Sequence, residues 1–157
     1  MPTQLAAGIR KALIVRLRGC VCAVPLTHVI ETMRPLPVEP ISGVPSFVRG
    51  ISIIRGIPTP VVDLGAILGT PGEGAVRFVT LRVGNKQMAL SVNAVLGVRD
   101  LDAIMTVREL PPLLQRASQE AVESIGALDE QVLMVLRAGW ELPEEVWHAL
   151  AAQEAVS

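Results

Sequence analysis

Cysteine and histidine are the residue types here that could support metal or redox chemistry, and they gather near the N-terminus. Cys20 and Cys22 are the two cysteines of the chain, and His28 follows them closely. In a strand, side chains at i and i+2 share a face, so a disulfide between such close neighbours would be strained. A zinc site needs about four ligands, and no convincing fourth is in view. We predict two small buried side chains in a strand and no metal or other cofactor, with a metal- or thiol-dependent enzyme as the alternative.

Charged residues in the central segment predict an ion pair rather than a reaction centre. Arg55 stands among isoleucines, where a cation needs a carboxylate or an exposed rim, and Glu31 is the nearest upstream carboxylate. We expect the two to pair at the surface, which by itself is worth roughly 0–1 kcal/mol. Asp63 ends an apolar run and is expected to cap a local turn. With two histidines and no second carboxylate or base beside Asp63, the chain offers little for general acid–base catalysis, and we predict that it is not an enzyme.

The bulk composition argues against nucleic acid and membrane partners. The net charge is −1 and aromatic residues make up 3% of the chain, whereas nucleic-acid binders usually carry a basic face. Mean hydropathy is high, at +0.48, but no uncharged apolar run reaches the roughly 18 residues of a membrane span. No signal peptide is visible either. We therefore expect a cytoplasmic protein whose apolar residues fill cores or partner interfaces.

The pattern of apolar residues predicts an all-β fold. Short β-branched runs alternate with turn residues, giving about ten strands in two groups of similar size. The hairpins at 11–24 and 76–92 resemble each other in pattern. The glycine-rich stretch 69–74 is the best internal boundary, so we predict one domain of two small β-barrels, at about 10–70 and 75–136. An amphipathic helix over about 142–153 is expected to follow them.

One long motif in the middle of the chain resembles a known family. The segment from Pro45 to Leu64 reads PSFVRGISIIRGIPTPVVDL. It resembles the signature of CheW-like domains, in which a Pro-x-Phe and a basic-Gly pair precede an Arg-Gly turn and a Val-Asp-Leu ending. The matching positions are Pro45, Phe47, Arg49, Gly50, Arg55, Gly56, Pro60, Val62, Asp63 and Leu64. The resemblance covers roughly residues 11 to 140.

This resemblance implies two packed SH3-like five-stranded barrels and an adaptor function. CheW-like adaptors bind the cytoplasmic tip of methyl-accepting chemoreceptors and the regulatory domain of a CheA-type histidine kinase, within chemoreceptor arrays. By position, the resemblance implies a receptor-facing groove formed by Val29, Glu31, Arg55, Val95 and Val98. It implies a kinase-facing surface with Val38, Ile41, Phe47 and Arg49, and a second contact with Arg108 and Leu113.

The sequence departs from the family pattern in ways that bear on partner choice. Ile53 stands where the family has Asn, Asn93 and Ala94 replace an acid and a glycine, and Ala89 replaces another glycine. These changes make the surface near the motif more apolar. A regulator of a dedicated kinase pathway without receptor coupling is therefore the alternative within the same family.

Overall fold

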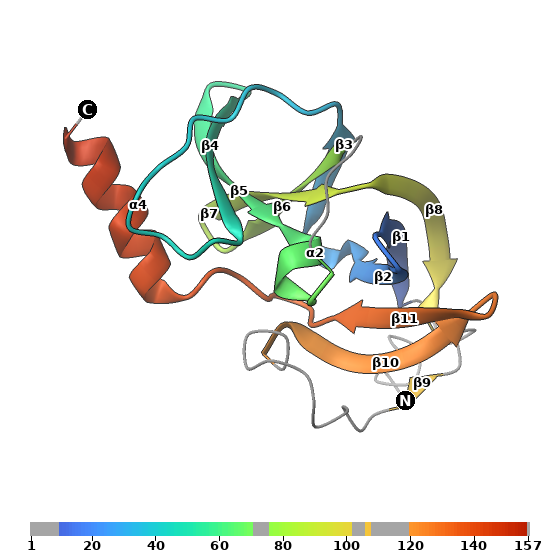
Figure 1. The fold of residues 1–157 in the computed structure, drawn as a ribbon. Helices are drawn as coiled ribbons and strands as arrows, with labels where there is room; N and C mark the ends of the chain where they lie inside the picture. Colours follow the sequence, from blue (N-terminus) through green and yellow to red (C-terminus); the bar gives the residue numbers. More distant parts are fainter. Residues whose placement is uncertain (1–9, 71–75, 102–105, 108–119, 157) are drawn as a thin grey trace.

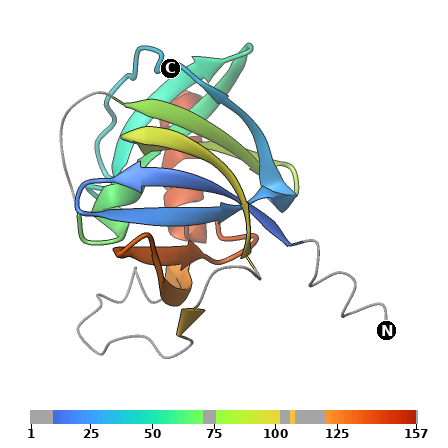
Figure 2. The same cartoon turned by 90° about the vertical axis from the view of Figure 1, so that its right-hand side faces the viewer.

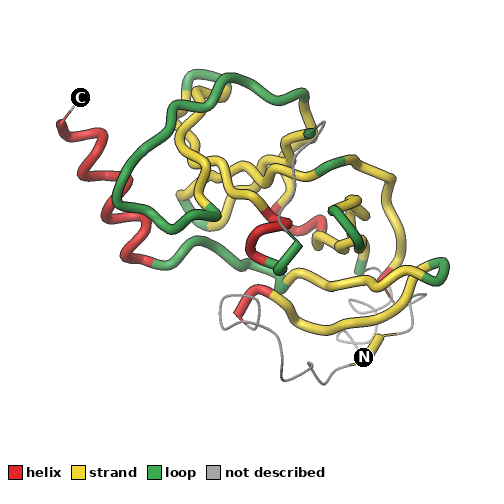
Figure 3. The backbone as a smooth tube through the Cα atoms, viewed as in Figure 1, coloured by secondary structure: helices red, strands yellow, loops and turns green. Residues whose placement is uncertain are grey.

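A computed structural model of the protein describes residues 10–70, 76–101, 106–107 and 120–156. Most of these residues lie in strands, and the predicted all-β class is confirmed (Figures 1 and 3). The strands are β1 (Lys11–Leu17), β2 (Cys20–Pro25), β3 (Val29–Met33), β4 (Val48–Ile54), β5 (Ile57–Asp63), β6 (Arg77–Val83), β7 (Lys86–Val92), β8 (Ala94–Asp100), β9 (Thr106–Val107), β10 (Val122–Leu128) and β11 (Gln131–Leu136). The helical elements are η1 (Leu26–His28), α2 (Leu64–Ile67) and α4 (Glu144–Val156).

The strands form two sheets of the same plan. One sheet has the order β8-β1-β2-β11-β10-β9 and the other has the order β3-β6-β7-β5-β4. In each, an antiparallel hairpin (β1–β2 or β6–β7) has an antiparallel edge strand on one side and a parallel neighbour on the other. The two hairpins whose sequences resemble each other thus occupy corresponding places in the two sheets. The second sheet has the five strands predicted for each barrel, and the first carries the two-residue strand β9 in addition.

The strand pairing corrects the predicted division at about 10–70 and 75–136. The chain leaves hairpin β1–β2 to supply β3, the edge strand of the other sheet, and it leaves β6–β7 to supply β8, the edge strand of the first. Each sheet therefore contains strands from both halves of the sequence. Without β8 and β3, strands β1 and β6 would each have one unpaired side, and the chain that continues from the opposite hairpin supplies the missing partner.

Each of the interleaved sheets buries apolar side chains on both of its faces. In β1, Leu13, Val15 and Leu17 enter a shared core between the sheets, while Ala12 and Ile14 enter a smaller cluster of the first sheet. The second sheet has its own cluster around Phe78. Strands buried on both faces read as continuous apolar runs, which accounts for the high hydropathy. Strands β1 and β7 contact each other where the sheets meet (Figure 2).

Helix α4 lies against the second sheet and completes the shared core (Figure 1). Leu142, Val146 and Leu150 are buried in that core. The helix begins at Glu144 rather than near residue 142. Pro143 precedes it, and its carbonyl accepts hydrogen bonds from the amides of Val146 and Trp147. Among the described residues, no helix has the length and apolar character needed to cross a membrane.

Candidate partner-binding surface

The predicted Glu31–Arg55 pair is present, and it joins opposite edges of the second sheet. Arg55 Nε and Nη2 donate to the two carboxylate oxygens of Glu31 at 2.6 and 2.8 Å. Glu31 lies on β3, whereas Arg55 lies in the turn after β4, the strand at the other edge. An arginine side chain bridges only a short distance, so the sheet must curl until its two edges approach. The forked geometry also holds both side chains in one orientation.

Local backbone geometry places Arg55 at this position. Arg55 and Gly56 link β4 to β5 in a two-residue turn, with φ values of +50° and +79°. Positive φ at both central residues is the hairpin geometry that matches the twist of the flanking strands. Hydrogen bonding to Arg55 lowers the pKa of Glu31 from its ordinary value, and the same contact raises the pKa of Arg55. The pair is therefore charged throughout the neutral range.

Exposed aliphatic side chains lie within two residues of Glu31 or Arg55 in the sequence. Ile53 is 60% exposed and Ile57 is 39% exposed on the β4–β5 hairpin, and Ile30 is 46% exposed beside Glu31 in sequence. Ile53 is one of the positions where the chain departs from the family pattern. An exposed apolar group with a fixed charge pair is typical of protein–protein contact surfaces.

The remaining residues of the predicted receptor-facing groove lie on two edge strands. Val29 is on β3 and Val95 and Val98 are on β8, so the two sheets contribute one edge each. Val29 and Val95 are partly buried and pack against the shared core. Val98 is half exposed, and Leu96 beside it is 45% exposed. Leu96 was not predicted from the sequence, because a bulge in the β1–β8 pairing falls at this point.

The predicted kinase-facing residues lie on the segment before β4 and on β4 itself. Ile41 and Phe47 pack against the shared core, and Val38 packs against the cluster around Phe78. These three side chains are therefore partly buried, and only their outer parts are available to a partner. Arg108 and Leu113, predicted for a second contact, lie outside the described residues.

Arg49 and Asp63 are brought together by the β4–β5 pairing. Arg49 Nη2 donates to Asp63 Oδ2 at 2.8 Å. The other carboxylate oxygen of Asp63 accepts the amide of Ala66 at 3.1 Å, so Asp63 is the N-cap of α2. The predicted capping role is confirmed, and the ion pair with Arg49 is an addition that the sequence did not indicate.

Cys20 and Cys22 are buried in the shared core, as predicted for two small side chains in a strand. Burial raises the pKa of both thiols, most strongly for Cys22. A raised pKa disfavours the thiolate, which is the form that reacts and binds metals. Among the described residues, no three histidine, cysteine or acidic side chains are grouped as metal ligands.

A cluster that was not predicted joins α4 to the β6–β7 hairpin. Trp147 Nε1 donates to Glu141 Oε1 at 3.1 Å, and Lys86 Nζ lies 3.4 Å from the same oxygen. Lys86 Nζ also lies 5.3 Å from the centroid of the Trp147 ring. No sequence signal linked Trp147 to Lys86, which is far away in the chain.

These features define an all-β protein of two interleaved sheets that presents apolar side chains and a fixed ion pair at its surface. The sequence model of the CheW-like domain matches residues 11–139. The chain belongs to the CheW-like domain family.

Individual proteins of the family show a similar sequence and fold. Chemotaxis protein CheW of Klebsiella aerogenes is 27% identical over 103 residues, which cover 63% of this chain and 61% of that protein. The chain thus matches less than two thirds of that relative. The crystal structure of the scaffolding protein TtCheW from Thermoanaerobacter tengcongensis superposes with a TM-score of 0.66 at 23% identity. The match covers 85% of this chain and 97% of that one, and it supports the fold.

Proposed function

We propose that this protein is a non-enzymatic adaptor that couples chemoreceptor tips to a CheA-type histidine kinase. The supporting observation is the forked Glu31–Arg55 contact, held across the edges of a curled sheet and accompanied by exposed isoleucines. A surface of this kind can orient a partner by charge while apolar anchors supply affinity. The proposal includes a cytoplasmic location beside receptor arrays, and neither nucleic acid nor membrane insertion forms part of it.

The proposed receptor contact combines two edge strands, β3 and β8, with the β4–β5 turn. It comprises Val29, Glu31, Arg55, Val95 and Val98. A receptor tip is a bundle of helices, and one of its helices would lie between β3 and β8 with Val98 as an exposed anchor. Coupling requires that the adaptor bind different receptor states with different affinity, because equal binding shifts no equilibrium.

The proposed kinase contact lies on the segment leading into β4. It comprises Val38, Ile41, Phe47 and Arg49, with Arg108 and Leu113 in a second contact. The backbone of this segment is fixed by Glu39, whose amide and carbonyl bond the carbonyl and amide of Ile51 at 2.8 and 2.9 Å. A fixed backbone lowers the entropy that binding must overcome.

A charge-reversal experiment tests the receptor contact. We expect Arg55→Glu to fold normally, since the Arg55 side chain is 74% exposed, and to bind a receptor-tip fragment at least about tenfold more weakly. Arg18→Glu is the matched control, because Arg18 is also exposed and lies in the β1–β2 turn. Titration calorimetry with the receptor fragment and, separately, with the kinase regulatory domain measures both contacts.

The same titrations address the second candidate, a regulator of a dedicated kinase without receptor coupling. Ile53 favours this candidate, because an apolar side chain 60% exposed replaces the Asn of the family pattern. Kinase binding with no receptor binding by the unmodified chain would select it over the coupling adaptor.

A further inference from the structure

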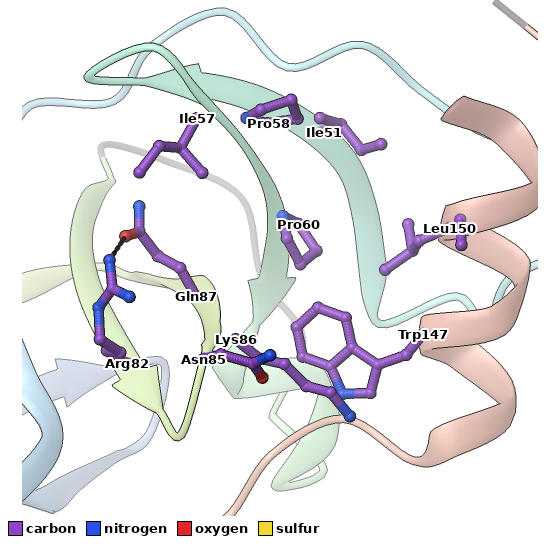
Figure 4. A pocket seen from close by; sticks show the side chains of 11 residues that line it. Ile51, Ile57, Pro58, Pro60, Arg82, Asn85, Lys86, Gln87, Trp147 and Leu150 are labelled. Atoms are coloured by element: carbon purple, nitrogen blue, oxygen red, sulfur yellow. Dashed lines mark hydrogen bonds between the residues drawn. The ribbon is translucent and has the colours of Figure 1, made fainter. Parts of the chain in front are cut away.

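A groove of about 300 Å³ separates the β4–β5 hairpin from the β6–β7 turn, with α4 along one side (Figure 4). Ile51, Pro58 and Pro60 line it from the hairpin, and Trp147 and Leu150 line it from the helix. Arg82 and Lys86 reach it from the opposite hairpin. The groove is therefore apolar on the walls formed by the β4–β5 hairpin and the helix, and basic along the remaining edge.

The prolines of β5 explain why the sheet opens here. Strand β5 pairs with β7 only over Val61–Asp63. Alternation along the β4–β5 ladder turns the backbone of Pro58 and Pro60 toward β7, and proline has no N–H to donate to a parallel partner. Side chains bridge the gap instead, where Gln87 Nε2 donates to Thr59 Oγ1 at 3.2 Å.

The helix wall of the groove is held rigidly. Val146 and Leu150 are buried in the shared core, and the Glu141 carboxylate holds both Trp147 and Lys86. The indole ring is thus fixed between the helix and the hairpin, as the close view shows (Figure 4). A preformed wall of this kind binds a partner at low cost in entropy.

On the β4–β5 side of the groove, the backbone offers few hydrogen-bonding groups to an added β-strand, which favours a helix as the occupant. Pro58 and Pro60 offer no amide, and the outward amide and carbonyl of Ile51 are already bonded to Glu39. A helix suits this wall, because it satisfies its own backbone hydrogen bonds and contacts the groove with side chains alone. A groove of about 300 Å³ can take aliphatic side chains from one face of a helix.

The charged side chains of the groove indicate which residues the docked helix carries beside its apolar face. The ionisable side chains that line the groove are Arg82 and Lys86, and both are basic. Glu141 balances Lys86, but Arg82 Nη2 bonds the neutral amide oxygen of Gln87 at 3.4 Å. We propose that this groove docks an amphipathic helix of another protein that has aliphatic anchors on one face and a carboxylate beside them, facing Arg82. The inference does not depend on receptor–kinase coupling.

A display selection with the full chain tests this inference. A library of helical peptides, with aliphatic residues at i, i+3, i+4 and i+7 and varied flanks, is selected on the protein, and single peptides are then titrated by fluorescence anisotropy. We expect acidic residues to be enriched on one flank. Ala151→Trp should weaken binding about 30-fold or more by filling the groove, because Ala151 is exposed and lines it. Arg82→Glu should weaken binding about fivefold, and a Glu-to-Lys change in the peptide should restore it.

Matched variants separate docking from folding. Ala127→Trp and Arg18→Glu make the same changes at exposed positions outside the groove, and circular dichroism checks each variant. Failure to recover any peptide would overturn the inference. So would peptides that bind Ala151→Trp as well as the unmodified chain, or that bind regardless of charge at Arg82.

Discussion

Gly50→Ala is predicted to be much more destabilising than an ordinary glycine substitution. Gly50 has φ +148°, and a Cβ at this position would lie 2.1 Å from the carbonyl oxygen of Glu39. That oxygen cannot move alone, because it accepts the amide of Ile51 at 2.9 Å while the Glu39 amide donates to the Ile51 carbonyl. The substitution must therefore displace the segment that carries Val38 and Ile41.

The magnitude follows from the contacts that are lost. Two backbone hydrogen bonds contribute about 1 kcal/mol each, and an L-residue in a glycine-favouring conformation costs about 1–2 kcal/mol. We expect a loss of roughly 3–4 kcal/mol in the free energy of unfolding, out of the roughly 5–15 kcal/mol typical of a domain.

Urea denaturation followed by circular dichroism measures this loss, with Gly84→Ala as the control. Gly84 has φ +63°, and a Cβ added there would meet nothing within 4 Å, so its substitution should cost about 1–2 kcal/mol from backbone strain alone. Equal losses for the two variants would refute the reasoning, since the close approach to Glu39 would then have no energetic consequence. Weaker binding of the kinase regulatory domain by folded Gly50→Ala is expected for the same reason.

Four further predictions concern the surface and the core. Ile53→Asn restores the residue of the family pattern and should change the free energy of unfolding by less than about 0.5 kcal/mol in urea titrations. It should weaken binding of the kinase regulatory domain or the receptor fragment, whichever the unmodified chain binds. Asp63→Ala should cost about 1–2 kcal/mol by the same measurement, because it removes the cap of α2, and Asp63→Asn should cost less. Arg55 lowers the pKa of Glu31 in the folded protein. The ion pair should therefore persist on acidification through pH 4.5, the ordinary pKa of a glutamate, and be lost as the pH falls through the lower pKa of folded Glu31. Carboxyl NMR should show the pKa of Glu31 rising in Arg55→Gln. Cys20 and Cys22 should react with a thiol reagent only after unfolding, and rapid reaction of the native protein would contradict their burial.

The strands were predictable because local signals define them. The hairpins expected at 11–24 and 76–92 are present as β1–β2 and β6–β7, since runs of β-branched residues end at Gly19 and at Gly84-Asn85. The interleaving of the sheets was not predictable in this way. The interleaving depends on which distant strand pairs at the edge of each sheet. The sequences of β3 and β8 do not indicate which strand each of them pairs with.

Part of the candidate site was also predictable from the sequence, and part of it was not. The Glu31–Arg55 pair was predictable, because a cation among isoleucines needs a carboxylate and the turn at Gly56 exposes it. The groove beside α4 was not, since it arises only when the prolines of β5 separate from β7 and the helix docks across the opening. Trp147 and Lys86 meet through tertiary packing alone.

Receptor control of kinase activity tests the central proposal most directly. A CheA-type kinase, receptor fragments and this protein are combined, and autophosphorylation is followed with labelled ATP. The proposal predicts that receptor state changes the rate only when the protein is present, that Arg55→Glu abolishes this control, and that Arg18→Glu retains it. A rate that responds to receptor equally with and without the protein would contradict it.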